Sequence, residues 1–255
     1  MLKQSKPSKD DIKIALHNTK KGKKDLNYIY LDKSDEEHSS TQSDKHIAID
    51  KKTDPTGLIP FIDIPKIKSI RIFISGSTGS GKTYLCEQIL KTSFNKAPNI
   101  YLFSSVNDDY KDFDNLLHVD IEDFNKGNPD VDIYTVLEPG SVCIFDDILS
   151  FSDKTLKLYM KLRSQCLATG RHKQLSTICI EQQPRNFIKS RDVLLNSEAY
   201  CFFPRASYLP YYKTCIDHIG LSKVDIEKYG KDTRWVFINK TFPSYIVRQY
   251  NVDMI

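Results

Sequence analysis

The sequence predicts an α/β fold in which helices cover both faces of a mostly parallel sheet, followed by a C-terminal β-hairpin. Three observations predict it. Several short runs after residue 65 are apolar at consecutive positions, as in parallel strands that are buried on both faces. Helical patterns separate some of these runs, which favours βαβ units. Two apolar runs near the C-terminus are joined by the short link TFP, which is typical of an antiparallel hairpin.

The N-terminal part differs in composition from the rest of the chain. Residues 1–64 are expected to form an extension, either partly disordered or a small accessory element, ahead of a main domain at 65–255. Up to residue 54 or so the extension is rich in Lys, Asp, Ser and Thr, and its apolar patches IKIAL and LNYIYL follow no sustained period. We therefore expect it to be loosely ordered. Its basic stretch KKGKK is a candidate for phosphate contact, although such runs are usually solvated tails.

The main domain is expected to contain six core strands and at least two long helices. The strands are predicted at residues 70–75, 99–104, 132–136, 141–147, 175–182 and 199–204. Helices are predicted at 82–93 and 153–169, and a further helical region near 208–229 precedes the hairpin formed by 234–240 and 244–250.

A glycine-rich stretch, ISGSTGSGKTYL, lies between the first predicted strand and the first predicted helix. It matches the pattern G-x-x-x-x-G-K-[ST], in which the backbone N–H groups of the loop and the helix N-terminus bind the phosphates of a nucleotide. Lys82 would reach the β- and γ-phosphates, and the hydroxyl of Thr83 would bind Mg²⁺. ATP and Mg²⁺ are therefore the expected cofactors. The residues expected to bind the nucleotide are Gly76, Ser77, Thr78, Gly79, Ser80, Gly81, Lys82 and Thr83.

Two adjacent acids follow the apolar run in SVCIFDDI. In ATPases with such a phosphate loop, a strand next to the loop ends in an Asp that holds the Mg²⁺, and a second acid polarises the attacking water. Asp146 suits the first role and Asp147 the second, although many such enzymes have Glu at the second position. The alternative is that Asp147 only caps the next helix.

The run LSTICIEQ ends in two amides, Gln182 and Gln183. An amide at the tip of a strand beside the phosphates can bind the γ-phosphate or its water and so sense hydrolysis. Basic residues lie just ahead of this run. In a ring of subunits such a residue can stabilise the γ-phosphate of the neighbour's nucleotide. Arg171 is the first candidate for this role in trans and Arg163 the second; a solvated basic turn is the alternative.

Together, GSTGSGKT, CIFDDI, TGRHKQLSTICIEQQP and AYCFFP resemble motifs of the FtsK-HerA superfamily of DNA-pumping ATPases. Within it, the chain is similar to the genome-packaging ATPases of large eukaryotic DNA viruses and virophages, over about residues 66–250. The resemblance implies a three-layer P-loop core of the RecA/FtsK-HerA type. It also implies that Asp146 binds Mg²⁺, that Asp147 is the catalytic base and that Gln182 is the sensor. Asp-Asp here departs from the Asp-Glu of many superfamily members.

The resemblance further implies a homo-oligomeric ring, a pentamer or hexamer, that packages double-stranded DNA into a capsid. The implied partners are DNA and a capsid or portal vertex protein, in the host cytoplasm or a virus factory. The formal charge of +4 is compatible with this, because only the loops that line a ring pore meet phosphates. Candidate pore residues are Arg185, Lys189 and Arg191, an exposed basic loop being the alternative.

Other readings of the same motifs remain. The closest is a cellular or plasmid DNA translocase of the same superfamily; a P-loop nucleotide kinase and a scaffold with a vestigial nucleotide site are more distant. A GTPase would need N-K-x-D and an ABC-type ATPase S-G-G-Q, and neither is present. No apolar stretch approaches the roughly 18 to 20 residues of a membrane helix, and no signal peptide is visible, so neither membrane insertion nor secretion is expected. The six cysteines lack metal-site spacing and are expected to be buried thiols.

Overall fold

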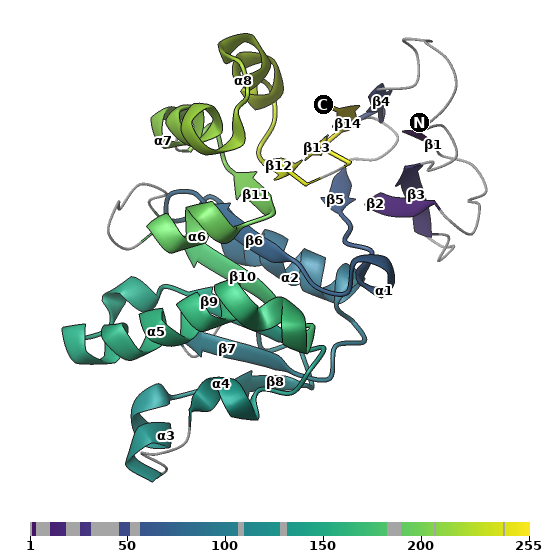
Figure 1. Ribbon diagram of the computed structural model, residues 1–255. Helices are drawn as coiled ribbons and strands as arrows, with labels where there is room; N and C mark the ends of the chain where they lie inside the picture. The colour runs from purple at the N-terminus through teal and green to yellow at the C-terminus, as the bar shows by residue number, and fades with distance from the viewer. Residues whose placement is uncertain are drawn as a thin grey trace.

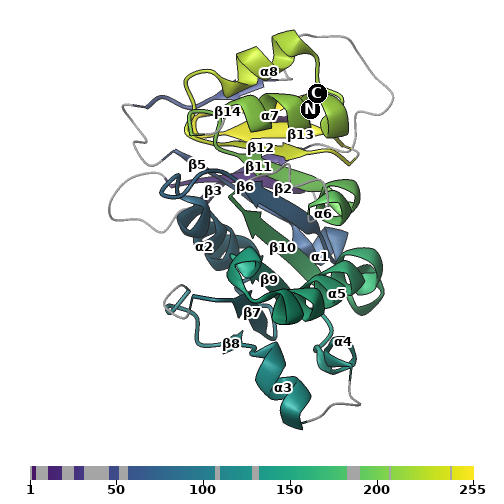
Figure 2. The same cartoon turned by 90° about the vertical axis from the view of Figure 1, so that its left-hand side faces the viewer.

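A mixed sheet of ten strands organises the described part of the chain (Figure 1). The strands lie in the order β4-β14-β13-β12-β11-β6-β10-β9-β7-β8. The helices α2 (Lys82–Ser93) and α5 (Asp153–Thr169) cover opposite faces of the sheet, which gives three layers (Figure 2). The computed structural model describes residues 2–3, 11–18, 26–31, 46–51, 57–106, 110–127, 132–182, 190–206, 208–241 and 243–255.

Six neighbouring strands of this sheet run parallel, and their side chains are mostly buried. Five of them match predicted strands, and both predicted helices begin and end where the sequence placed them. The predicted α/β fold class is therefore confirmed. The parallel strands are β6 (Arg71–Ser75), β7 (Ile100–Ser104), β8 (Leu116–His118), β9 (Val142–Asp146), β10 (Ser176–Glu181) and β11 (Ala199–Phe202).

One predicted strand is wrong. Residues 132–136 form the short helix α4 (Ile133–Val136), which begins where the carboxylate of Asp132 accepts a hydrogen bond of 3.1 Å from the N–H of Tyr134. This N-cap satisfies a free donor of the first turn, and it outweighs the strand preference of an Ile-Tyr-Thr-Val run. The edge strand β8 and the helix α3 (Ile121–Gly127) were not predicted.

The C-terminal hairpin is confirmed and is part of a larger antiparallel unit. β12 (Val236–Asn239) pairs with β13 (Tyr245–Arg248), and β14 (Asn251–Met254) adds a third strand that the sequence did not predict. The predicted helical region consists of α7 (Tyr208–Thr214), a π-helical turn (Cys215–Ile219) and α8 (Lys223–Gly230). β12 joins the parallel strands through an antiparallel pairing with β11.

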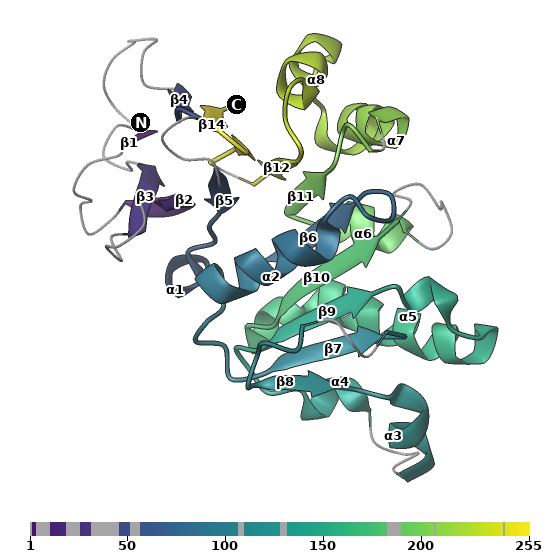
Figure 3. The same cartoon turned by 180° about the vertical axis from the view of Figure 1, so that it is seen from behind.

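The described part of the N-terminal extension contains strands where no regular element was predicted. β1 (Leu2–Lys3), β2 (Ile12–Asn18), β3 (Leu26–Leu31) and β5 (Leu58–Pro60) form a small antiparallel sheet, and β4 (His46–Ala48) pairs with β14 of the large sheet. The small sheet lies beside the C-terminal strands (Figure 3), and its residues Ile14 and Ile29 are buried in the same core as Val247. The division at residue 64 stays a prediction, and Lys20–Lys24 lie outside the described residues.

All six cysteines are buried free thiols, as predicted. None of the helices in the described ranges combines the length and the apolar character that a bilayer crossing needs.

Candidate nucleotide-binding site

The loop between β6 and α2 has the backbone that its glycines allow. Gly79 and Gly81 have φ angles of 75° and 103°, in the left-handed region that costs little only for glycine. A Cβ on Gly76 would lie 2.7 Å from Oγ of Ser80 and 3.0 Å from the ring of Phe203. The N–H of Ser80 donates to the carbonyl of Ser77 at 3.2 Å, which closes the loop on itself. The glycines of the pattern are thus fixed by backbone geometry and by packing.

Lys82 is the first residue of α2 and lies over the loop. Its Nζ donates to the carbonyl oxygen of Ser77 at 3.1 Å. Half-burial lowers the pKa of Lys82, and the nearby carboxylates of Asp146 and Asp147 oppose this shift. The loop, the start of a twelve-residue helix and a lysine therefore meet at one point, where helix dipole and backbone N–H groups favour an anion.

The first of the two acids is the last residue of β9, and the second follows it directly. Asp146 is buried, and its carboxylate accepts a hydrogen bond of 3.0 Å from the hydroxyl of Tyr110. Asp147 has a φ of 47°, a left-handed conformation that is uncommon for a residue other than glycine and that clusters at functional sites. It precedes the 3₁₀ turn Ile148–Ser150, but its side chain makes no capping hydrogen bond there. Capping alone therefore does not explain Asp147.

Gln182 lies beside the second acid. β10 pairs with β6 on one side and with β9 on the other, so that Ile180 is opposite both Ile74 and Asp146. The strand with the acids is therefore not the direct neighbour of β6, because β10 lies between them. The exposed amide of Gln182, one residue beyond β10, donates to Oδ1 of Asp147 at 3.3 Å. Gln183 lies outside the described residues.

Arg163 occupies a different place from the one predicted. It is fully buried on α5, and its guanidinium donates to Glu181 and to Asp192, both at 2.9 Å. Burial raises the pKa of Glu181, and the charge of Arg163 opposes that shift. A guanidinium held in this way cannot reach a neighbouring subunit, so the predicted role of Arg163 in trans is wrong. Instead it neutralises the buried acid that ends β10, next to Gln182.

Arg171 is exposed in the 3₁₀ turn Gly170–Lys173, which comes just before β10. Because β10 runs parallel to β6, this turn lies at the edge of the sheet where β6 begins, opposite the phosphate loop. Within one subunit Arg171 is therefore far from the site, and its role in trans stays a prediction. Lys173 in the same turn has a structural partner, since its Nζ donates to the carbonyls of Tyr134 and Thr135 at 2.7 and 3.0 Å.

The structure adds one residue that the sequence did not indicate. Arg234 lies between α8 and β12, and its Nε donates to the carbonyl oxygen of Ser80 at 3.2 Å. Its guanidinium fills the space next to Gly81, where an added Cβ would lie 2.7 Å from Nη2. No motif marks Arg234, because its contact with the loop spans 154 residues of sequence.

The side chains at the site fit the expected cofactors in chemical type. A threonine hydroxyl at 83 and a carboxylate at Asp146 are the hard oxygen ligands that Mg²⁺ prefers. Groups of three or more His, Cys, Asp or Glu that could hold a metal are absent from the described ranges. Mg²⁺ commonly uses one or two carboxylates together with phosphate oxygens and water, so the donor set is adequate.

No family model matches the chain, and no curated protein matches it. Solved structures do. The genome packaging NTPase B204 from Sulfolobus turreted icosahedral virus 2, in complex with ATP-gammaS, is 15% identical over 72% of this chain and 97% of its own, with a TM-score of 0.48. The pCW3 conjugation coupling protein TcpA, in its monomer form with ATPgS, is 14% identical over 92% of this chain and 76% of its own, with a TM-score of 0.44. The structural neighbours of this chain thus include a viral packaging NTPase and a conjugation coupling protein.

Proposed function

We propose that this protein hydrolyses ATP at the edge of the sheet where β6, β10 and β9 end. The observation that carries the proposal is the contact between Gln182 and Asp147 beside the phosphate loop. A phosphate-binding loop alone fits kinases as well as hydrolases. A strained acid linked to an amide next to that loop is an arrangement suited to positioning water.

Each residue of this site has a distinct task in the proposed reaction. The loop and Lys82 bind the phosphates, and Thr83 with Asp146 would hold Mg²⁺, which supplies charge stabilisation when bound. Asp147 orients the attacking water and accepts its proton. Gln182 holds Asp147 before the reaction and can change partner when the γ-phosphate is lost. Arg163 and Glu181 position Gln182 by anchoring the end of β10.

We further propose that hydrolysis drives duplex DNA through a homo-oligomeric ring, with packaging of a viral genome into a capsid as the specific role. The combined sequence motifs support this. The exposure of Arg171 is compatible with it, because a residue that acts on the nucleotide of a neighbouring subunit has to lie at the surface of its own subunit. A capsid or portal vertex protein would then be the partner, in the host cytoplasm or a virus factory.

The test measures ATP hydrolysis by the full chain with and without duplex DNA, and with a nucleoside monophosphate as a control acceptor. We expect hydrolysis that duplex DNA accelerates. Phosphoryl transfer to the monophosphate without any effect of DNA would identify a kinase instead. If duplex DNA does not change the rate of ATP hydrolysis, the protein is an ATPase but not a DNA translocase. A plasmid translocase and a packaging motor differ in partner, so co-purification with capsid protein separates those two roles.

A further inference from the structure

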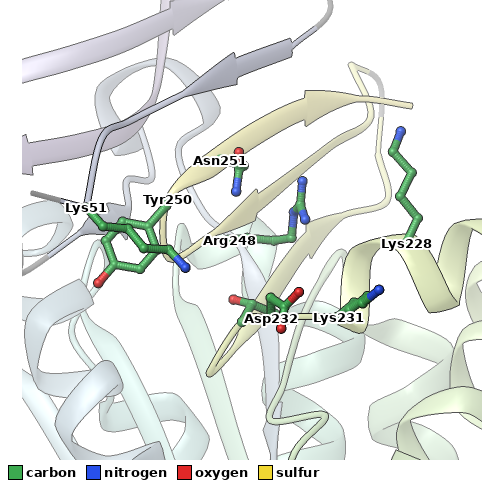
Figure 4. Close-up of a pocket in the computed structure, with 8 residues that line it drawn as sticks. Lys51, Lys228, Lys231, Asp232, Arg248, Tyr250 and Asn251 are labelled. Atoms are coloured by element: carbon green, nitrogen blue, oxygen red, sulfur yellow. The ribbon is translucent and has the colours of Figure 1, made fainter.

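A second polar site lies at the same edge of the sheet as the phosphate loop. It is a pocket of about 190 Å³ on the C-terminal strands, formed by the end of α8 and the residues that follow it, by the turn between β13 and β14, and by Lys51, three residues after β4 (Figure 4). Four cationic side chains and one carboxylate line it. The lining residues are Lys51, Lys228, Lys231, Asp232, Thr233, Arg248, Tyr250 and Asn251.

The cations of this pocket are only partly neutralised. Arg248 is about nine-tenths buried and pairs with Asp253 at 2.8 Å, yet its Nε has no hydrogen-bond partner among the described residues. Within the same ranges, neither Lys228 nor Lys231 pairs with a carboxylate. Lys51 lies 5.1 Å from the ring centroid of Tyr250. A buried guanidinium N–H without a hydrogen-bond partner is costly.

The size and the charge of the pocket favour a phosphate group over a whole nucleotide. The volume is smaller than the roughly 300–1,000 Å³ of typical pockets for small molecules. An arginine and lysines around a small cavity match phosphate oxygens, because guanidinium offers a rigid pair of donors and ammonium offers a point charge.

The pocket and the phosphate loop are joined by the sheet itself. Ser75, the last residue of β6, pairs with Phe202, which pairs with Val236, which pairs with Arg248. Ser75 and Arg248 are therefore three strand spacings apart, which corresponds to about 14 Å. The connection is also covalent, since residues 231–233 line the pocket and Arg234, the next residue, donates to the loop.

From these observations we infer that the pocket binds a backbone phosphate of duplex DNA, at a site that the sequence motifs do not mark. The inference rests on the proposed DNA-handling function. Among sources of phosphate, we favour the DNA backbone, because exposed lysines line the pocket and the pocket is too small for a nucleotide.

The experiment measures the affinity of the full chain for fluorescent duplex DNA over a range of salt concentrations, for the wild type and for Lys228→Ala/Lys231→Ala. The matched control is Lys96→Ala/Lys240→Ala, which removes two exposed lysines at the opposite edge of the sheet. We expect the slope of log affinity against log salt to fall by about 1 for each pocket lysine, for any DNA sequence, and to stay unchanged in the control. ATP binding, which uses other residues, should survive in both variants.

Three results would overturn the inference, and they differ from one another. If the pocket variant binds DNA as well as the wild type does, the pocket is not a DNA-binding site, and the proposed function is unaffected. If the wild type binds no DNA, both the inference about the pocket and the proposed DNA-handling function are wrong. If inorganic phosphate raises the unfolding temperature of the wild type but not of the pocket variant, while DNA binding is equal, the source is free phosphate. Lys228→Glu/Lys231→Glu gives a second, stronger test of the same slope if the alanine variant is poorly folded.

Discussion

The side-chain amide of Gln182 donates a hydrogen bond of 3.3 Å to the carboxylate of Asp147. The two residues are 35 positions apart, and each is the first residue after a neighbouring strand of the sheet. The amide therefore holds the acid that is expected to orient water.

Gln182→Ala should retain ATP binding and lower the rate of hydrolysis by about 10², because one preorganised donor at a reaction centre has about that effect. The variant should fold normally, since Gln182 is exposed. Equilibrium binding of ATP and single-turnover hydrolysis measure the two effects. Gln165→Ala, an amide on α5 that bonds to Asp132, is the control and should not change the rate. Equal rates for the wild type and Gln182→Ala would show that Gln182 is no sensor.

Arg163→Met should destabilise the fold by about 3–5 kcal/mol, because it leaves Glu181 as an uncompensated buried charge. Denaturant unfolding measures the loss. The control Arg171→Met removes an exposed guanidinium and should change stability by less than about 0.5 kcal/mol.

The stability of the Arg163→Met variant should also depend on pH. Burial already raises the pKa of Glu181, and without Arg163 that pKa rises further. A carboxyl whose pKa is higher in the folded state stabilises the fold below its unfolded pKa, and this contribution is lost as pH rises through the folded pKa. The variant should therefore be closest to wild type under acidic conditions and lose stability toward neutral pH. A difference between variant and wild type that does not change with pH would argue against a buried charged pair.

Gly81→Ala should impair nucleotide binding for two separable reasons. The left-handed backbone at Gly81 costs an alanine about 1–2 kcal/mol, and the added Cβ meets the guanidinium of Arg234. Arg234→Ala removes only the second conflict. A double-mutant cycle on ATP affinity should thus show that Gly81→Ala costs less in the Arg234→Ala background than in the wild type. Strictly additive effects would mean that Arg234 does not contact the loop in solution.

Arg171→Ala tests whether the site is completed by a second subunit. If Arg171 acts in trans, Arg171→Ala and Asp147→Asn should each be inactive alone. A mixture of the two should regain part of the activity, because some interfaces would then combine an intact site with an intact Arg171. The mixture is assayed for DNA-stimulated hydrolysis at fixed total protein. If mixed rings assemble but regain no hydrolysis activity, a residue other than Arg171 acts in trans.

The sequence predicted those parts of the site that are local in the chain. The glycines, Lys82 and Thr83 occur in one short pattern, and Asp146, Asp147 and Gln182 each follow an apolar run that is typical of a buried strand. Arg234 could not be predicted, because its contact with the loop exists only once β12 is placed in the sheet.

The burial of Arg163 could have been predicted from helical periodicity. It falls on the same stripe of α5 as Leu156, Tyr159 and Cys166, all of which are buried. An arginine on an apolar stripe needs a buried acid, and Glu181 is that acid. In contrast, the strand predicted at 132–136 is wrong because a short apolar run carries no decisive period, and Asp132 caps a helix at this position.

The most direct test of the proposed ATPase site compares the wild type with Asp147→Asn in two measurements on the same protein, ATP affinity and the rate of ATP hydrolysis. Asn keeps the size of the side chain and a hydrogen-bonding oxygen, but it cannot accept a proton. We expect unchanged ATP affinity and a rate reduced by about 10²–10⁴, the usual contribution of a general base. Hydrolysis by Asp147→Asn at the wild-type rate, or a wild type that binds no ATP, would contradict the account.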